Sequence, residues 1–270
     1  MERGSKPTVK KIAIAFTGTG KYLNFFPRYY ETFSEFFAPD CEKHFFVFTD
    51  GEADEIPDDI TWVQIEENQN ITGADYRDAN WHKLMSMTIG GLRRFETLLT
   101  IKEQLKDFDW FVFLDGDMYC CDKVVTYEEF FNEDKDYFGI QHPTFSNHWS
   151  EDNGRRPFER DKKSLSAVTK KEQLDDIYLQ GCVWGGKVPA VFELIEELDA
   201  RIKTDIENDV MAVAHDESHL NRYRFENPEL FHILSPAFAK PGNYPTKEFD
   251  FEPRFIHSPK NKKKILEGKA

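Results

Sequence analysis

The feature that most constrains the fold is a run of five large apolar residues, WFVFL at 110–114, followed at once by Asp115-Gly116-Asp117. Such a run is typical of a strand that is buried on both faces. Open α/β sheets bind ligands outside the carboxyl ends of their strands, which is where these two carboxylates fall. Gly116 lets the backbone turn tightly and approach a ligand closely. The stretch therefore predicts both a central strand and a ligand site at its end.

Two carboxylates separated by a glycine offer hard oxygen ligands. Such ligands suit Mg²⁺ or Mn²⁺, which are typically shared with the phosphates of a substrate. The alternative is a solvated turn after a core strand, because an isolated D-x-D motif carries a high risk of false positives. The neighbouring segments are needed to choose between a metal site and a solvated turn.

The size and charge of the chain narrow the class of protein. Its 270 residues fit one large α/β domain, and a hydrophobic content of 40% with 25 phenylalanines supplies a sizeable core. A net charge of −14 argues against nucleic acid as the main partner, because binding to nucleic acid requires a basic surface. A small ligand that bears phosphate would need a metal or a local cationic patch. We interpret residues 1–270 as a single domain.

Targeting signals are not evident in the sequence. No stretch approaches the roughly 18–20 apolar residues of a membrane helix, and residues 1–11 lack the apolar segment of a secretory signal. The four cysteines have no zinc-like spacing, and the adjacent pair is a poor disulfide framework. We expect a soluble cytoplasmic protein with reduced thiols and with flexible tails at 1–10 and 260–270. The thiols are Cys41, Cys120, Cys121 and Cys182.

Strand and helix patterns alternate along the first third of the chain. Apolar patterns predict strands at 11–16, 45–48 and 61–65. Between the first two of these strands, the aromatic residues of 22–37 have helical spacing. This alternation of strands and helices predicts a largely parallel, doubly wound sheet. We assign the aromatic stripe to the core rather than to a stacking platform. The loop TGTG at 17–20 follows the first strand, where nucleotides often bind, although it lacks both common phosphate-binding glycine motifs.

Two polar stretches interrupt this pattern. We interpret residues 66–80 as a loop and residues 144–176 as a functional lid or mobile loop, because long segments without a strong pattern are usually of this kind. Residues 85–106 have a helical pattern with an interruption at Gly90-Gly91. From this helix Arg94 can reach a phosphate bidentately, and the alternative for it is a solvated helix face.

The second half contains the most specific segments. Three glycines in YLQGCVWGG at 178–186 indicate close packing of the backbone against a ligand or another strand. Residues 191–206 form an amphipathic helix. HDESHLN at 215–221 groups several titratable side chains without the spacing of a zinc protease. The alternative for HDESHLN is a polar helix start with Asp216 or Ser218 as the cap. The basic tail 253–270 is either solvated or folds over the site.

Taken in order, these landmarks resemble glycosyltransferase family six. They are the D-x-D motif at a strand end, His142-Pro143, YLQGCVWGG, HDESHLN and Leu234-Ser235-Pro236, and they extend from about residue 11 to the tail. The resemblance implies an α/β GT-A fold, a single Rossmann-like domain with a central, mostly parallel sheet flanked by helices. It also implies retaining transfer of galactose or N-acetylgalactosamine from a UDP-sugar to the 3-hydroxyl of a β-galactoside, in α-1,3 linkage.

The resemblance also implies roles for individual residues. Asp115 and Asp117 are similar to the ligands that bridge Mn²⁺ (or Mg²⁺) to the diphosphate. Glu217 is similar to the catalytic carboxylate that faces the anomeric carbon, and Asp216 to a neighbour that holds the hydroxyls of the donor sugar. The remaining positions implied for the UDP-sugar are Phe16, Thr17, Thr19, Tyr22, Arg94 and Lys260, and those implied for donor and acceptor sugars are His142, Gln180, Gly181 and Cys182.

This sequence departs from the family pattern at several points. Bacterial members often carry N-x-N and work without a metal, whereas Asp115 and Asp117 predict metal dependence here. We expect the chain to start at the catalytic domain, as bacterial-type members do, and its uridine loop to be one residue longer than in mammalian members. Gln180 and Cys182 match neither known donor pattern, so the donor sugar stays open.

Two rival functions remain. A phosphatase of the haloacid-dehalogenase type also places D-x-D after an apolar strand, but near the N-terminus and with Thr or Val soon after, where this chain has Met118-Tyr119. A non-catalytic module that binds UDP-sugars or glycans would have kept the fold and lost the chemistry. The joint presence of Asp115, Asp117 and Glu217 argues against such a loss.

Overall fold

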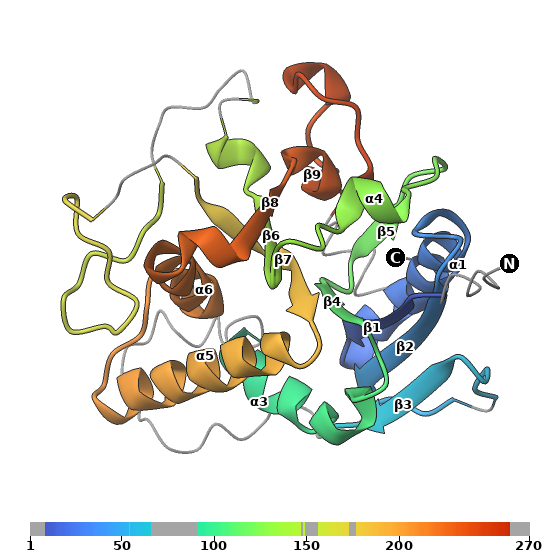
Figure 1. Cartoon of the computed structure of the whole chain (residues 1–270), viewed down its shortest axis with the longest axis horizontal. Coiled ribbons are helices and arrows are strands. Elements are labelled where there is room, and N and C mark those ends of the chain that lie inside the picture. The colour runs from blue at the N-terminus through green and yellow to red at the C-terminus, as the bar shows by residue number, and fades with distance from the viewer. Residues whose placement is uncertain are drawn as a thin grey trace, which may run out of the picture.

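The computed structural model describes residues 9–53, 55–65, 91–146, 148, 156–172 and 177–259. Its centre is a seven-stranded sheet with helices on both faces (Figure 1). From one edge to the other, the strands are β3 (Ile60–Gln64), β2 (Glu42–Thr49), β1 (Lys11–Thr17), β4 (Trp110–Leu114), β7 (Leu179–Lys187), β6 (Tyr137–Gln141) and β8 (Phe231–Leu234).

The sheet is mostly parallel, as predicted. Strand β1 pairs in parallel with β2 and β4, β2 with β3, and β6 with β8. Strand β7 alone runs antiparallel to both of its neighbours, β4 and β6. The sheet therefore has two parallel parts, β3-β2-β1-β4 and β6-β8, which are joined through the antiparallel strand β7. The strand order reverses between β1 and β4, because β2 and β3 lie on one side of β1 and the later strands lie on the other.

Strand β4 lies at the centre of the molecule and is buried along its whole length. Trp110, Val112 and Leu114 belong to the core on one face of the sheet, whereas Phe111 and Phe113 belong to the core on the other. This alternation is what a run of apolar residues produces when helices cover both faces of a sheet. The prediction of a doubly buried strand ahead of the D-x-D motif is confirmed.

Helix α1 (Phe26–Phe36) covers the first of these faces. A 3₁₀ turn over Gly20–Phe25 precedes it, so the helix begins later than the predicted 22–37. Tyr29 and Phe33 are fully buried in α1, and the ring of Phe16 packs edge-on against Tyr29 with 5.0 Å between the centroids. The aromatic stripe is core, as expected.

Three helices cover the opposite face: α3 (Arg94–Leu99), α5 (Ala190–Glu207) and α6 (His215–Glu226) (Figure 1). Helix α5 packs against both others and matches the predicted amphipathic helix. Helix α3 is shorter than the predicted 85–106, because a 3₁₀ turn at Lys102–Leu105 interrupts the pattern. The predicted loop at 66–80 and the start of that helix lie outside the described residues.

A small second sheet lies beside the end of β4. Its strands are β5 (Met118–Cys120), β10 (Phe255–His257) and β9 (Lys240–Pro241), and α4 (Tyr127–Phe130) follows β5 in the chain. This sheet brings the C-terminal strand next to the D-x-D motif. None of the helices in the described ranges is both long and apolar enough to cross a membrane.

The predicted lid segment is packed where it is described. Phe158 and Val168 are buried with Tyr178 in a satellite core. The carboxylate of Glu159 is buried and accepts a hydrogen bond from the backbone N–H of Val213, at 2.6 Å. Residues 156–172 therefore hold the turn that leads into α6. All four cysteines are described, and all are free thiols, as expected.

Candidate active site

The D-x-D turn follows β4 directly and lies against the end of β1. A Cβ atom at Gly116 would come within 2.7 Å of the backbone oxygen of Thr17. The glycine is thus needed because two strand ends meet here. Asp115 is partly exposed toward a pocket, whereas only 3% of the Asp117 side chain is exposed.

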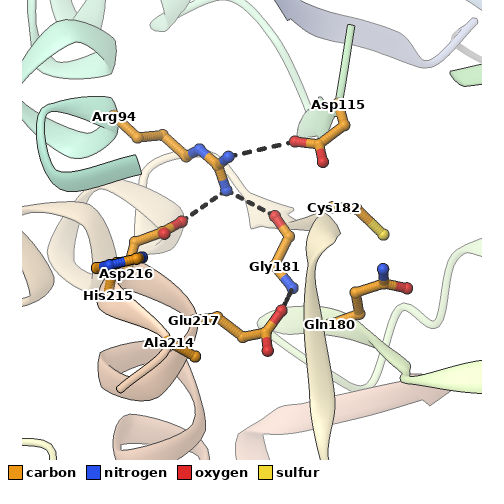
Figure 2. A pocket seen from close by; sticks show the side chains of 9 residues that line it. All are labelled: Arg94, Asp115, Gln180, Gly181, Cys182, Ala214, His215, Asp216 and Glu217. Atoms are coloured by element: carbon orange, nitrogen blue, oxygen red, sulfur yellow. Dashed lines mark hydrogen bonds and ion pairs between the residues drawn. The ribbon is translucent and has the colours of Figure 1, made fainter. Parts of the chain in front are cut away.

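Arg94 connects three elements that meet at this pocket (Figure 2). Its Nη1 atom donates to Asp216 Oδ2 at 2.6 Å and to the backbone oxygen of Gly181 at 2.7 Å. Its Nη2 atom donates to Asp115 Oδ1 at 3.2 Å, and the guanidinium lies 4.3 Å from the centre of the Phe113 ring. A guanidinium with several donors in one plane is suited to holding strand ends and carboxylates together. Arg94 is therefore buried in the site rather than solvated.

Glu217 lies in the first turn of α6 and faces β7. Its Oε2 atom accepts a hydrogen bond from the backbone N–H of Gly181 at 2.8 Å (Figure 2). A Cβ atom at Gly181 would lie 3.3 Å from Glu217 Cβ, so an alanine there would crowd the carboxylate. The glycine thus allows the helix to approach the strand closely.

One turn further along α6, Asn221 clamps the start of β7. Its Oδ1 atom accepts from the N–H of Leu179 at 2.8 Å, and its Nδ2 atom donates to the oxygen of Leu179 at 2.9 Å. The same Nδ2 atom donates to the backbone oxygen of Glu217 at 2.9 Å. The pairing of β4 with β7 ends at Leu114 and Val183, so side chains from α6 take over where β4 stops.

A bulge in β7 presents the pocket residues. Gly139 of β6 is opposite Trp184, but the next residue, Ile140, is opposite Gln180, so residues 181–183 form extra length in β7. Bulges redirect side chains and often occur at active sites. The other two glycines of this strand pack against neighbouring backbone, since a Cβ atom at Gly185 would lie 2.1 Å from the oxygen of Phe111. The prediction of close backbone packing is confirmed.

These elements enclose a pocket of 240 Å³. Pockets for drug-sized ligands are typically about 300–1,000 Å³, so we expect this one to receive one part of a larger molecule. Arg94 and Asp115 lie at one end of the pocket, and Glu217 lies at the other (Figure 2). The lining residues are Arg94, Asp115, Gln180, Gly181, Cys182, Ala214, His215, Asp216 and Glu217.

Burial shifts the acid–base properties of the pocket. Burial raises the pKa of Glu217 to about 7; the hydrogen bond from the Gly181 N–H and the nearby Tyr178 hydroxyl oppose this, and the charges of Asp216 and Asp115 add to it. Burial also raises the pKa of Asp216, although the Arg94 cation opposes it. A carboxyl group poised near neutral pH in a cleft is typical of a functional site.

Of two further groups in the pocket, the Cys182 thiol stays uncharged and the Arg94 guanidinium stays charged. Burial raises the pKa of the Cys182 thiol well above its ordinary value, so this residue offers the pocket a neutral surface rather than a thiolate nucleophile. Burial lowers the pKa of Arg94, but Asp216 and Asp115 outweigh that effect and raise it. Arg94 therefore remains a cation.

A candidate cation site lies beside the pocket. Asp115, Asp117 and His257 each place one ligand atom within 4.8 Å of the others. Two carboxylates and an imidazole fit a divalent ion in their chemistry. The Nδ1 atom of His257 lies 3.4 Å from Asp117 Oδ1, so this nitrogen faces the carboxylates. Sequence reasoning missed His257, because only the pairing of β10 with β5 reveals that it lies there.

The predicted donor loop lies at the end of β1. The Phe16 side chain is fully buried in the core, and its ring packs against Gly116 of the D-x-D turn. Thr17 ends β1, Thr19 precedes the 3₁₀ turn without capping it, and Tyr22 is half-buried within that turn. None of these four residues is among those that line the described pocket.

His142, which was predicted to contact the sugars, is not among the residues that line the described pocket. His142 begins a 3₁₀ turn, and its Nδ1 atom accepts from the N–H of Thr144 at 3.2 Å. Burial lowers the pKa of His142 to about 3, so its imidazole is neutral. Lys260 lies outside the described residues.

The interpretation of HDESHLN as a capped helix start is wrong for Asp216. The residue before the helix is Ala214, and Asp216 is instead paired with Arg94. Ser218 does contribute, because its Oγ atom accepts from the N–H of Ala214 at 3.0 Å. The acidic residues of this segment therefore face the pocket rather than the helix end.

Comparison with known proteins points to one family. The family model described as glycosyltransferase family 6 matches residues 5–265. The O-antigen biosynthesis glycosyltransferase WbnI of Escherichia coli is 26% identical over 233 residues, which cover 86% of this chain and 89% of that protein. Two vertebrate relatives are also similar, although the chain spans less than two thirds of their length.

The globoside alpha-1,3-N-acetylgalactosaminyltransferase 1 of Homo sapiens is 25% identical over 238 residues, which cover 86% of this chain and 62% of that protein. The histo-blood group ABO system transferase 1 of Rattus norvegicus is 28% identical over 225 residues, which cover 81% of this chain and 58% of that protein. The central, mostly parallel sheet flanked by helices is consistent with a GT-A-like fold. The chain belongs to glycosyltransferase family 6 and is a hexosyltransferase.

Proposed function

We propose that this chain, as one catalytic domain, transfers galactose or N-acetylgalactosamine from a UDP-sugar to the 3-hydroxyl of a β-galactoside with retention of configuration. The product would carry an α-1,3 linkage. The name of the Homo sapiens relative, an alpha-1,3-N-acetylgalactosaminyltransferase, supports this class of donor and linkage, although it describes that protein. The name of the bacterial relative supports a role on a glycan.

The observation that carries the proposal is the arrangement of two carboxylates across one pocket. Asp115, beside the cluster with Asp117 and His257, lies at one end, and Glu217 lies at the other. Breaking the bond between a sugar and UDP builds negative charge on the diphosphate and positive charge on the anomeric carbon. An acidic end suited to a cation and an opposing carboxylate match these two developing charges.

Each residue then has a distinct task. Asp115 and Asp117 would hold a divalent ion, which supplies charge stabilisation for the leaving diphosphate when it is bound. Arg94 adds a fixed positive charge, because its cation is held by buried carboxylates. Asp216 would accept hydrogen bonds from the hydroxyls of the donor sugar. Glu217 would stabilise the sugar cation on one face, or trap it covalently.

The donor and acceptor sugars would contact the β7 bulge. Gln180 and Cys182 line the pocket and are the residues that we expect to sense the 2-substituent of the donor. His142, with its neutral imidazole, would contact the acceptor. The uridine would lie on the backbone of the loop that follows β1, with Tyr22 and Thr19, since the ring of Phe16 is buried. Lys260 would close over the diphosphate.

A release assay tests the proposal. UDP release from UDP-galactose and UDP-N-acetylgalactosamine is measured with a panel of β-galactosides, with and without Mn²⁺. We expect acceptor-dependent release with one donor and an α anomeric configuration in the product by NMR. Hydrolysis of simple phosphate esters without a response to UDP-sugars would favour the phosphatase. Binding of UDP-sugars without transfer or hydrolysis would favour the non-catalytic module.

A further inference from the structure

We propose that Glu159 is a positioning residue for sugar transfer, because its buried carboxylate holds the turn that aims Asp216 and Glu217 at the pocket. This inference rests on the proposed function, since it concerns the two carboxylates that face the donor sugar there. Glu159 is not among the residues that line the described pocket. Its effect on the reaction therefore passes through the backbone of the turn and not through contact with a sugar.

The turn before α6 has a strained backbone. His215 has a φ angle of 49°, in the left-handed region that residues other than glycine rarely adopt. Such a conformation costs free energy and persists only when the surrounding structure imposes it. Because His215 directly precedes Asp216 and Glu217, its backbone angles set the direction in which both side chains leave the helix. All three residues line the pocket, together with Ala214. Some tertiary contact must therefore hold this turn.

The Glu159 carboxylate supplies that contact. Its Oε2 atom accepts a hydrogen bond from the backbone N–H of Val213 at 2.6 Å, across 54 residues of the chain. Its Oε1 atom accepts from the N–H groups of Arg160 and Asp161, at 2.7 and 2.6 Å. Only 7% of Glu159 is exposed, and hydrogen bonds from backbone N–H groups to a carboxylate are stronger than those between neutral groups. One carboxylate thus joins residues 159–161 to the turn before α6.

The other hydrogen bonds of this turn, within the part of the chain that the structure describes, are local. The N–H of His215 donates to the oxygen of Ala212 at 3.0 Å, and the N–H of Ala214 donates to Ser218 Oγ at 3.0 Å. Neither bond connects the turn to another part of the molecule. The Val213 side chain is 61% exposed, so its own packing does not hold it. The bond to the buried carboxylate is therefore the polar contact that ties the turn to the segment 156–172.

The body of α6 is fixed separately. The Nε2 atom of His219 lies 3.4 Å from Asp205 Oδ2 of α5, and both side chains are buried. Asp205 also accepts from Ser164 Oγ at 2.5 Å and from the N–H of Leu165 at 2.9 Å. The segment that carries Glu159 thus also holds the helix behind its first turn. We therefore expect loss of the Glu159 bond to move the first turn while the rest of α6 stays in place.

The first test replaces the carboxylate by an amide of the same shape. Glu159→Gln puts an NH₂ group in place of one of the two acceptor oxygens, so a backbone N–H then faces a donor. We expect kcat to fall roughly 10–100-fold, because small misplacements of catalytic groups are costly, while the Kd of UDP stays near that of wild type. An unchanged kcat, or a loss of UDP affinity as large as the loss of kcat, would overturn the proposal.

Glu172→Gln is the matched control. Glu172 belongs to the same segment and accepts from Arg222 of α6 at 3.0 Å, away from the turn. We expect this variant to keep the wild-type kcat, because the bond between Glu159 and Val213 is intact in it. A loss of kcat equal to that of Glu159→Gln would show that any weakening of the segment has the same effect, and would refute a specific role for Glu159.

The second test keeps every side chain. An ester in place of the peptide bond at Val213 removes the N–H that binds Glu159, and we expect the same loss of kcat. In the wild-type chain we expect this N–H to exchange slowly with solvent, although the Val213 side chain is exposed. Fast exchange, or a full rate in the ester variant, would overturn the role of Glu159 and leave the proposed function intact. An absence of transfer by the wild-type chain would instead contradict the proposed function, and this inference with it.

Discussion

Asn221→Ala tests whether a side chain of α6 supplies hydrogen-bond partners to the backbone of β7 beyond the point where β4 ends. Asn221 is buried and makes three hydrogen bonds, two to Leu179 and one to the backbone oxygen of Glu217, at 2.8, 2.9 and 2.9 Å. The substitution removes all three and leaves the N–H and the C=O of Leu179 unbonded. Leu179 is fully buried, so water cannot replace the lost partners without opening the strand.

The cost follows from these two peptide groups. A buried donor or acceptor that loses its partner costs about 1–3 kcal/mol, so the pair costs roughly 2–6 kcal/mol. That is a large part of a total stability of about 5–15 kcal/mol. Because the start of β7 also carries the N–H that binds Glu217, we expect turnover to fall more than UDP affinity.

Asn227→Ala is the matched control. Asn227 Nδ2 also donates to the carbonyl oxygen four residues back, that of Tyr223, at 3.0 Å. The expected loss is only about 1 kcal/mol, the usual contribution of one hydrogen bond. Urea denaturation of both variants, with the slope checked for a constant m value, gives the two free energies of unfolding. A loss in Asn221→Ala no larger than in Asn227→Ala would refute the clamp.

Four further predictions concern the pocket. Glu217→Gln cuts turnover by several orders of magnitude and leaves UDP affinity nearly intact; a rate near that of wild type, measured by UDP release, would remove Glu217 from catalysis. Turnover rises with pH through about pH 7, because the buried Glu217 must lose its proton to act, and a profile that is flat from acid to alkaline pH would contradict this. The same raised pKa means that the folded state binds a proton more readily than the unfolded state, so Glu217 lowers the free energy of unfolding as pH rises from about 4 to 7, by up to roughly 3 kcal/mol, and Glu217→Gln removes that loss in denaturation series at several pH values. EDTA abolishes transfer and lowers the melting temperature of the Mn²⁺-loaded protein, and Mn²⁺ restores both; full activity in chelator would show that Asp115 and Asp117 hold no metal.

The sequence by itself determined the local elements. WFVFL had to be a strand buried on both faces, because five apolar residues in a row leave no polar side for solvent. The spacing of apolar residues likewise determined α5, and aromatic spacing determined the buried side of α1. The order of landmarks around Asp115 and Glu217 was enough to indicate the family, which the family match then showed.

Only the tertiary structure decided which distant residues meet. The antiparallel direction of β7, its bulge at 181–183 and the pairing of β10 with β5 all depend on contacts between segments far apart in the chain. Hydrophobic periodicity reports which face of an element is buried, but it carries no information about the partner that covers it. For that reason Arg94, Asp115 and Asp216 could be named from the sequence while their mutual bonds could not, and His257, which no local pattern distinguishes, became visible only beside Asp117.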